Sequence, residues 1–108
     1  MRACKVFILG TALLLLTHPA ALLAEDSGEP TARRLINALG CKGCHKLEGD
    51  GGSLAPDLDQ IGSRMSRDQI RQHLAAHAQE NPKGFMPSYN TTSQEELTLI
   101  SDFLYNLQ

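Results

Sequence analysis

Two cysteines and a histidine stand at a spacing that suits covalent attachment of a prosthetic group. The run is Cys41-Lys42-Gly43-Cys44-His45, so two residues separate the thiols and the imidazole follows at once. Thiols at this separation can add to the two vinyl groups of a porphyrin as thioethers, and the next histidine can bind the iron from one face. The run therefore predicts one covalently bound haem c, with Cys41 and Cys44 as attachment points and His45 as an axial iron ligand.

A pair of cysteines two residues apart can also serve as a redox dithiol or as half of a zinc site. A zinc site needs further Cys or His ligands at suitable spacing, and the sequence has no second Cys-x-x-Cys pair. A thioredoxin-like dithiol would lie in a strand–helix–strand pattern, which the flanking sequence does not show. We therefore favour haem attachment.

The second axial position of the iron decides the chemistry. A methionine there gives a low-spin electron carrier of relatively high potential, whereas an open position permits ligand binding or peroxide chemistry. Beyond residue 24 the sequence has two methionines, Met65 and Met86. Met86 precedes Pro87 in a predicted loop, where a stiffened backbone can hold the sulfur over the ring. We predict Met86 as the second ligand, with Met65, His73 and His77 as the alternatives.

His73 and His77 also share one face of a predicted helix, because they are four residues apart. This spacing suits metal ions. No glutamate follows His73, as it would in a zinc-protease helix. We interpret both histidines as solvated or partly packed side chains.

The first 24 residues have the features of an export signal. Arg2 and Lys5 form a positive start, an apolar run covers residues 6–16, and Ala24 is a small residue of the kind that precedes a cleavage site. We predict a signal peptide over residues 1–24, cleaved after Ala24, and a periplasmic location for the remaining chain.

A retained membrane anchor is the alternative use of this first segment. A membrane-spanning helix needs about 20 apolar residues. The apolar run is shorter than that, and His18-Pro19 interrupts it. We favour cleavage, which would leave no membrane span.

Cleavage would leave residues 25–108 as one domain, near the small end for a self-supporting core. An apolar macrocycle at its centre would add core material, which suits a chain without tryptophan. Loss of Arg2 and Lys5 leaves eight Lys and Arg against twelve Asp and Glu, a formal net charge of −4. This acidic balance argues against a nucleic-acid partner and favours redox proteins with a basic docking surface. We expect a monomer.

Three helices are predicted in this domain. The first runs from Pro30 to just before Gly40, the second follows Ser66 and ends near Gln79, and the third follows Ser93 and runs to the end of the chain. Each serine has Gln or Glu three residues later, which is a capping box. Apolar residues recur at helical spacing along the three segments: Ala32, Leu35, Ile36, Leu39, Ile70, Leu74, Leu97, Ile100, Phe103, Leu104 and Leu107. The glycine-rich segment 46–53 is predicted as a surface loop.

These features resemble a small bacterial class I monohaem cytochrome c over residues 30–108. The matching runs are Cys41-Lys42-Gly43-Cys44-His45, Ala55-Pro56-Asp57-Leu58, Met86-Pro87 and the terminal Phe103-Leu104-Tyr105-Asn106-Leu107. The resemblance implies an all-α cytochrome c fold, with three to four short helices around one covalent haem and with the first and last helices packed together. It also implies that the Pro56 carbonyl accepts a hydrogen bond from His45 Nδ1–H, which would fix the imidazole ring.

The expected function is one-electron transfer by an exported carrier that is not an enzyme. The iron would cycle between Fe(III) and Fe(II) with His45 and Met86 retained as ligands. One alternative is an electron-transfer subunit of a larger dehydrogenase or reductase complex. Another is an open-site haem enzyme such as a peroxidase, against which Met86 argues. A haem sensor would need an output domain, for which we expect no room in this chain.

Overall fold

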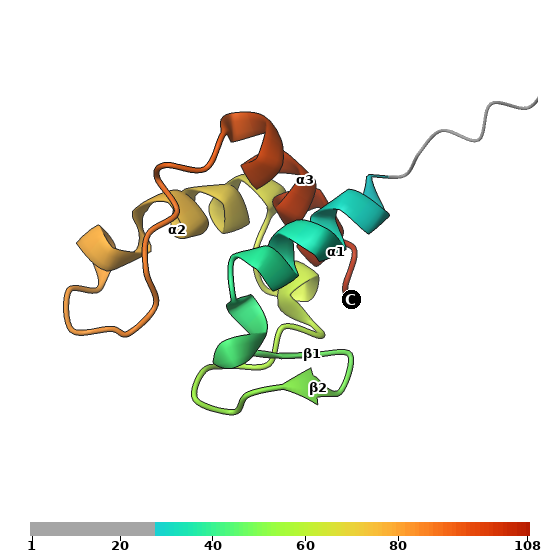
Figure 1. The fold of residues 1–108 in the computed structure, drawn as a ribbon, viewed down its shortest axis with the longest axis horizontal. Helices are drawn as coiled ribbons and strands as arrows, with labels where there is room; N and C mark the ends of the chain where they lie inside the picture. Colours follow the sequence, from blue (N-terminus) through green and yellow to red (C-terminus); the bar gives the residue numbers. More distant parts are fainter. Residues whose placement is uncertain (1–27) are drawn as a thin grey trace, which may run out of the picture.

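The structure is a computed structural model, and it describes residues 28–108. The predicted signal peptide over residues 1–24 lies outside the described residues. The described part contains three α-helices, two one-turn 3-10 helices and one short β-hairpin (Figure 1). No helix within it is long and apolar enough to cross a membrane.

The α-helices are α1 (Glu29–Ala38), α2 (Arg67–Glu80) and α3 (Gln94–Tyr105). Pro30 lies in the first turn of α1, where its missing N–H leaves no helical hydrogen bond unmade. The predicted helices match these three segments, apart from the end of the last one.

Both predicted capping boxes are present. Ser66 Oγ accepts a hydrogen bond from the Gln69 N–H at 3.2 Å, and the Gln69 side chain accepts one from the Ser66 N–H at 2.8 Å. Ser93 and Glu96 form the same reciprocal pair at the start of α3. Each box satisfies two N–H groups that have no partner within the helix, which fixes where α2 and α3 begin.

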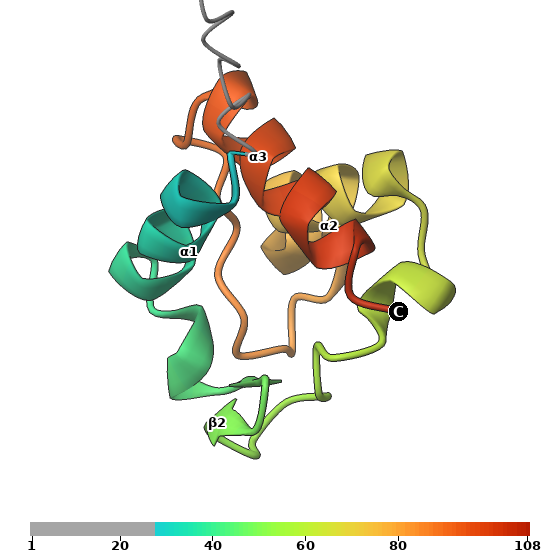
Figure 2. The ribbon, with the colours of Figure 1, turned by 90° about the vertical axis from the view of Figure 1, so that its right-hand side faces the viewer.

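Helix α3 lies at the centre of the fold, between α1 and α2 (Figure 2). Its buried side chains join those of the other two helices in one hydrophobic core. The members of this core are Ala32, Ile36, Leu47, Ile70, Leu74, Leu97, Ile100, Phe103 and Leu104. The predicted packing of the first helix against the last is confirmed, and so is the all-α cytochrome c fold class.

The prediction that the last helix runs to the end of the chain is wrong, because α3 ends at Tyr105. The 3-10 helix η2 (Ile61–Ser63) crosses this end of α3 closely. The Gly62 N–H donates to the Leu107 carbonyl at 3.0 Å, and a Cβ at Gly62 would overlap the Tyr105 carbonyl. The last residues therefore leave the helix to pair with η2.

The prediction of a simple loop over residues 46–53 is also incomplete. Strands β1 (Lys46–Leu47) and β2 (Asp50–Gly51) form an antiparallel hairpin, and Leu47 is buried in the core. The two turn residues have positive φ values, 51° at Glu48 and 80° at Gly49, as two-residue hairpin turns of the primed types require. Strands of two residues are too short to show an alternating pattern in the sequence.

Candidate functional site

The two thiols lie on the one-turn 3-10 helix η1 (Cys41–Gly43) and on the residue that follows it. Gly40 adopts a left-handed conformation with φ 75°, which turns the chain from α1 into η1. The N–H groups of Cys44 and His45 both donate to the Cys41 carbonyl, at 3.3 and 3.0 Å. Side chains three residues apart lie on the same side of a 3-10 turn, so η1 presents the two free thiols together.

The Tyr89 side chain lies beside the Cys41 thiol. Burial raises the pKa of the Cys41 thiol, although the neighbouring Tyr89 hydroxyl acts against this rise. Burial raises the pKa of Tyr89 to about 12, and the neighbouring Cys41 adds to this rise. The Tyr89 hydroxyl also donates to the Leu39 carbonyl at 3.3 Å. Cys41 is therefore held as a neutral, partly buried thiol beside a neutral phenol.

His45 is oriented by the main chain of Pro56. Its Nδ1 lies 2.6 Å from the Pro56 carbonyl oxygen, the contact that the family resemblance implies. Because a carbonyl oxygen can only accept a hydrogen bond, Nδ1 carries a hydrogen, and in the neutral imidazole the lone pair is then on Nε2. This is the tautomer that a metal-binding imidazole adopts when its other nitrogen has a partner.

Two backbone hydrogen bonds hold the Pro56 carbonyl in place. The Ala55 N–H donates to the Cys44 carbonyl, and the Leu58 N–H donates to the Lys46 carbonyl, both at 3.0 Å. The segment with Pro56 is thus paired with residues on either side of His45. These main-chain bonds position the Pro56 carbonyl.

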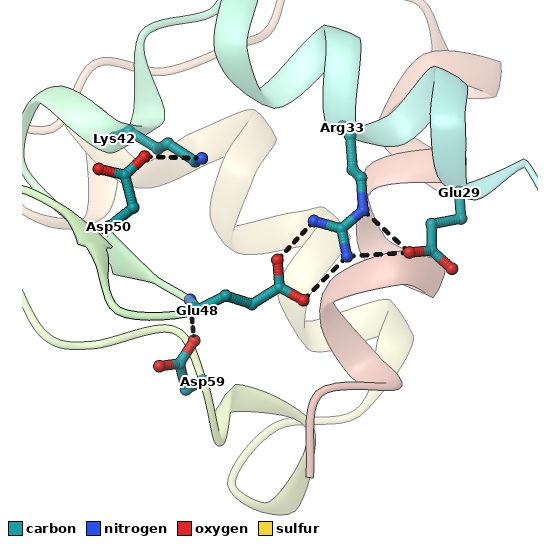
Figure 3. A network of polar contacts seen from close by, with 6 residues as sticks. All are labelled: Glu29, Arg33, Lys42, Glu48, Asp50 and Asp59. Carbon is teal, nitrogen blue, oxygen red and sulfur yellow. Dashed lines mark hydrogen bonds and ion pairs between the residues drawn. The ribbon is translucent and has the colours of Figure 1, made fainter.

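A network of charged side chains fixes the hairpin beside this site (Figure 3). Arg33 on α1 contacts both carboxylate oxygens of Glu48, at 2.5 and 2.9 Å, and also contacts Glu29 at 2.8 Å. The Glu48 N–H donates to the carboxylate of Asp59. Glu48, at the tip of the hairpin, is therefore tied to α1 on one side and to the loop after Pro56 on the other.

The Arg33 guanidinium and the Glu48 carboxyl group shift each other's pKa. The hydrogen bonds that Arg33 donates to Glu48, and then to Glu29, raise the pKa of Arg33 above its usual range. Its hydrogen bonds to Glu48 lower the pKa of that carboxyl group. The Arg33 guanidinium also lies 4.7 Å from the centre of the Phe103 ring, so it links the hairpin to α3 as well.

Met65 and Met86 are both partly buried, and both pack against the core. Their surroundings differ. The Met65 N–H donates to the Ile61 carbonyl at 3.0 Å at the end of η2. The Met86 carbonyl accepts a hydrogen bond from His77 Nδ1 on α2 at 3.2 Å. Met86 therefore lies in a loop that a neighbouring helix holds through a side chain.

His73 and His77 contact each other edge to face, with ring centres 4.5 Å apart. His73 Nδ1 lies 3.6 Å from a carboxylate oxygen of Glu80. Among residues 28–108, no group of three Cys, His, Asp or Glu side chains is arranged to hold a metal ion. Both histidines are half-buried, in keeping with the interpretation of partly packed side chains.

The described residues thus form an α-helical domain in which a thiol pair and the adjacent imidazole suit covalent binding of haem. The family model described as Cytochrome c matches residues 31–108, and the chain belongs to the cytochrome c family. The family implies covalently bound haem c, and its members are typically electron-transfer proteins. No curated protein and no solved structure gives a significant match to the chain.

The residues of the site fit such a group. The thiols are close in sequence and share one side of a turn, and His45 Nε2 is free to bind iron. Partly buried apolar side chains offer further surface that a macrocycle can cover. They are Leu35, Leu39, Leu58, Ile61, Met65 and Met86.

Proposed function

We propose that the protein is an exported, monomeric electron carrier with a single haem c. Cys41 and Cys44 hold the haem as thioethers, and His45 and Met86 bind its iron. The contact of 2.6 Å between His45 Nδ1 and the Pro56 carbonyl carries this proposal, because it sets the imidazole in the tautomer that can bind iron. When bound, the haem supplies an Fe(III)/Fe(II) couple.

The chain's own contribution is to hold its ligands still. The backbone pairs around Pro56 fix the direction of His45 Nε2, and the hydrogen bond to the carbonyl makes the imidazole a stronger donor. Met86 is preferred over Met65 because its loop is held by α2, whereas Met65 directly precedes the cap of α2. Ligands that stay in place in both oxidation states leave little to rearrange, which favours fast electron transfer.

We further propose that residues 1–24 direct export to the periplasm. We also propose that redox partner proteins dock on this acidic protein through a basic surface of their own. The formal net charge of −4 after cleavage supports the second point. Association between opposite charges weakens as salt screens them, over a Debye length of about 8 Å at physiological ionic strength. An association rate that is independent of ionic strength would contradict this docking model.

The test of the site is a pair of matched methionine variants in the haem-loaded protein. Optical spectra of the parent should show c-type haem bands and the methionine–Fe(III) charge-transfer band. Met86→Ala should lose the charge-transfer band and lower the reduction potential, whereas Met65→Ala should keep both. Loss of the band in Met65→Ala alone would assign the ligand to Met65, and absent c-type bands would refute haem attachment.

The same variants separate a carrier from an open-site enzyme. If Met86 closes the iron site in the parent, the Met86→Ala variant should bind azide and react with peroxide much faster than the parent does. Equal rates in the parent and in Met86→Ala would favour the peroxidase alternative. Copurification with a larger complex at native abundance would favour the subunit alternative.

A further inference from the structure

The loop that carries Met86, residues 85–90, is hydrogen-bonded to the last two turns of α2. His77, Ala78 and Gln79 are consecutive residues of that helix, and each bonds to the loop. His77 Nδ1 contacts the Met86 carbonyl at 3.2 Å, and the Ala78 N–H donates to Ser88 Oγ at 2.8 Å. Ser88 Oγ–H in turn donates to the Gln79 side chain at 2.7 Å.

The loop also forms hydrogen bonds with the backbone of α2. In a regular helix the Ala78 N–H pairs with the Leu74 carbonyl, four residues earlier. Ser88 Oγ accepts a hydrogen bond from the Ala78 N–H, and the Leu74 carbonyl accepts one from the Tyr89 N–H at 2.8 Å. Both members of one helical pair therefore have partners in the loop. Such an arrangement fixes the position of the loop along the helix axis.

The residues that precede Met86 do not anchor the loop to the core. Residues 80–85 are all exposed, and a hollow lies between His77 and the link from Glu80 to Gly84. Within this link a turn closes on itself, since the Gly84 N–H donates to the Asn81 carbonyl at 2.8 Å. Among the residues immediately before Met86 there is thus no buried anchor. After this link, the hydrogen bond from His77 to the Met86 carbonyl is the first hydrogen bond that joins the loop to α2.

We propose that His77 is a positioning residue of the iron site, which holds the Met86 main chain through its Nδ1–H and so keeps the methionine sulfur on the iron. This inference rests on the proposed function, because it takes Met86 as the axial ligand. In this role His77 acts through the Met86 main chain and does not serve as an iron ligand. Its effect is to raise the free-energy cost of opening the loop.

The test uses imidazole added to the ferric, haem-loaded protein, because imidazole binds iron only when the methionine has left. Loss of one neutral hydrogen bond, about 1 kcal/mol, should make imidazole bind about fivefold more tightly to His77→Phe. His77→Asn keeps an N–H donor near the position of Nδ1 and should stay within about twofold of the parent. The matched control His73→Phe makes the same change one turn earlier. It keeps an aromatic ring against His77, removes the contact of His73 with Glu80, and should leave the affinity unchanged.

Two further results make the outcome decisive. Amide hydrogen exchange of residues 84–90 should be faster in His77→Phe than in His73→Phe, which reports the loop without reference to the iron. Equal imidazole affinity and equal exchange in the two Phe variants would overturn the inference. If the parent lacked the methionine–iron band, the proposed ligand would be wrong, and the exchange data would still decide whether His77 holds the loop.

Discussion

His45 and Pro56 are linked through the Nδ1–H of one and the main-chain carbonyl of the other, across 2.6 Å. The acceptor is part of the backbone, and backbone hydrogen bonds from Ala55 and Leu58 fix it on both sides. The orientation of the imidazole therefore depends on chain geometry, and the side chain at position 56 contributes only stiffness. This separation of roles leads to the first prediction.

Pro56→Ala should keep the iron site and lose stability. The carbonyl remains, so the reduction potential and the optical spectrum of the haem-loaded protein should be close to those of the parent. The unfolded chain gains freedom when proline is removed, which should lower the free energy of unfolding by about 0.4–1 kcal/mol. Potentiometry and denaturant titration measure the two quantities. A large change in potential would show that the proline ring itself aims the carbonyl.

Glu48→Gln should destabilise the protein at neutral pH and make no difference in acid. Arg33 lowers the pKa of Glu48 in the folded state, so the ionised carboxyl stabilises the fold above its unfolded pKa of about 4.3. That contribution is lost as the pH falls through the lower, folded value. Denaturation midpoints of parent and variant should therefore differ at pH 7 and converge in acid.

Asp50→Asn is the matched control for this pH dependence. Asp50 lies on the same hairpin and pairs with Lys42 at 3.2 Å, through a single contact and with its side chain 80% exposed. Exposed single pairs contribute little to stability, so the variant should behave like the parent across the pH range. A larger effect for Asp50→Asn than for Glu48→Gln would contradict the role given to the Arg33 network.

Gly62→Ala should destabilise the crossing between η2 and the end of α3. A Cβ at this position would overlap the Tyr105 carbonyl, which belongs to the backbone and cannot rotate away. Forced shifts of this kind typically cost about 1–3 kcal/mol. Gly43→Ala is the control, because a Cβ there meets no atom within 4 Å. Thermal unfolding of the two variants should separate them clearly, and equal melting temperatures would refute the close crossing.

The sequence was sufficient for those parts of the fold and site that depend on local spacing. The run from Cys41 to His45 is complete within five residues, and the capping boxes at Ser66 and Ser93 each span four. Helical periodicity correctly assigned the buried faces, including Leu97 and Ile100. Each of these features is determined by neighbours along the chain, so a pattern in the sequence can reveal it.

Contacts between distant residues had no such pattern. Arg33 and Glu48 are 15 residues apart, and the Tyr89 hydroxyl and the Leu39 carbonyl are 50 residues apart. Such pairs depend on how α1, the hairpin and the Met86 loop come together, which spacing does not encode. The sequence indicates His77 as a ligand or as a solvated or partly packed side chain, whereas in the structure its Nδ1 contacts the Met86 carbonyl.

Leu97→Ala tests whether α3 is the centre of the core. Leu97 is fully buried in a helix that packs on both α1 and α2, and removal of such a side chain typically costs about 2–5 kcal/mol, because a cavity remains. Leu54→Ala makes the same change at a side chain that is 87% exposed and should alter stability by less than about 0.5 kcal/mol. Denaturant unfolding of both haem-loaded variants, followed by far-UV circular dichroism, measures the difference. If the two leucines proved equivalent, the core would not be centred on α3, because only a buried side chain leaves a cavity when it is shortened.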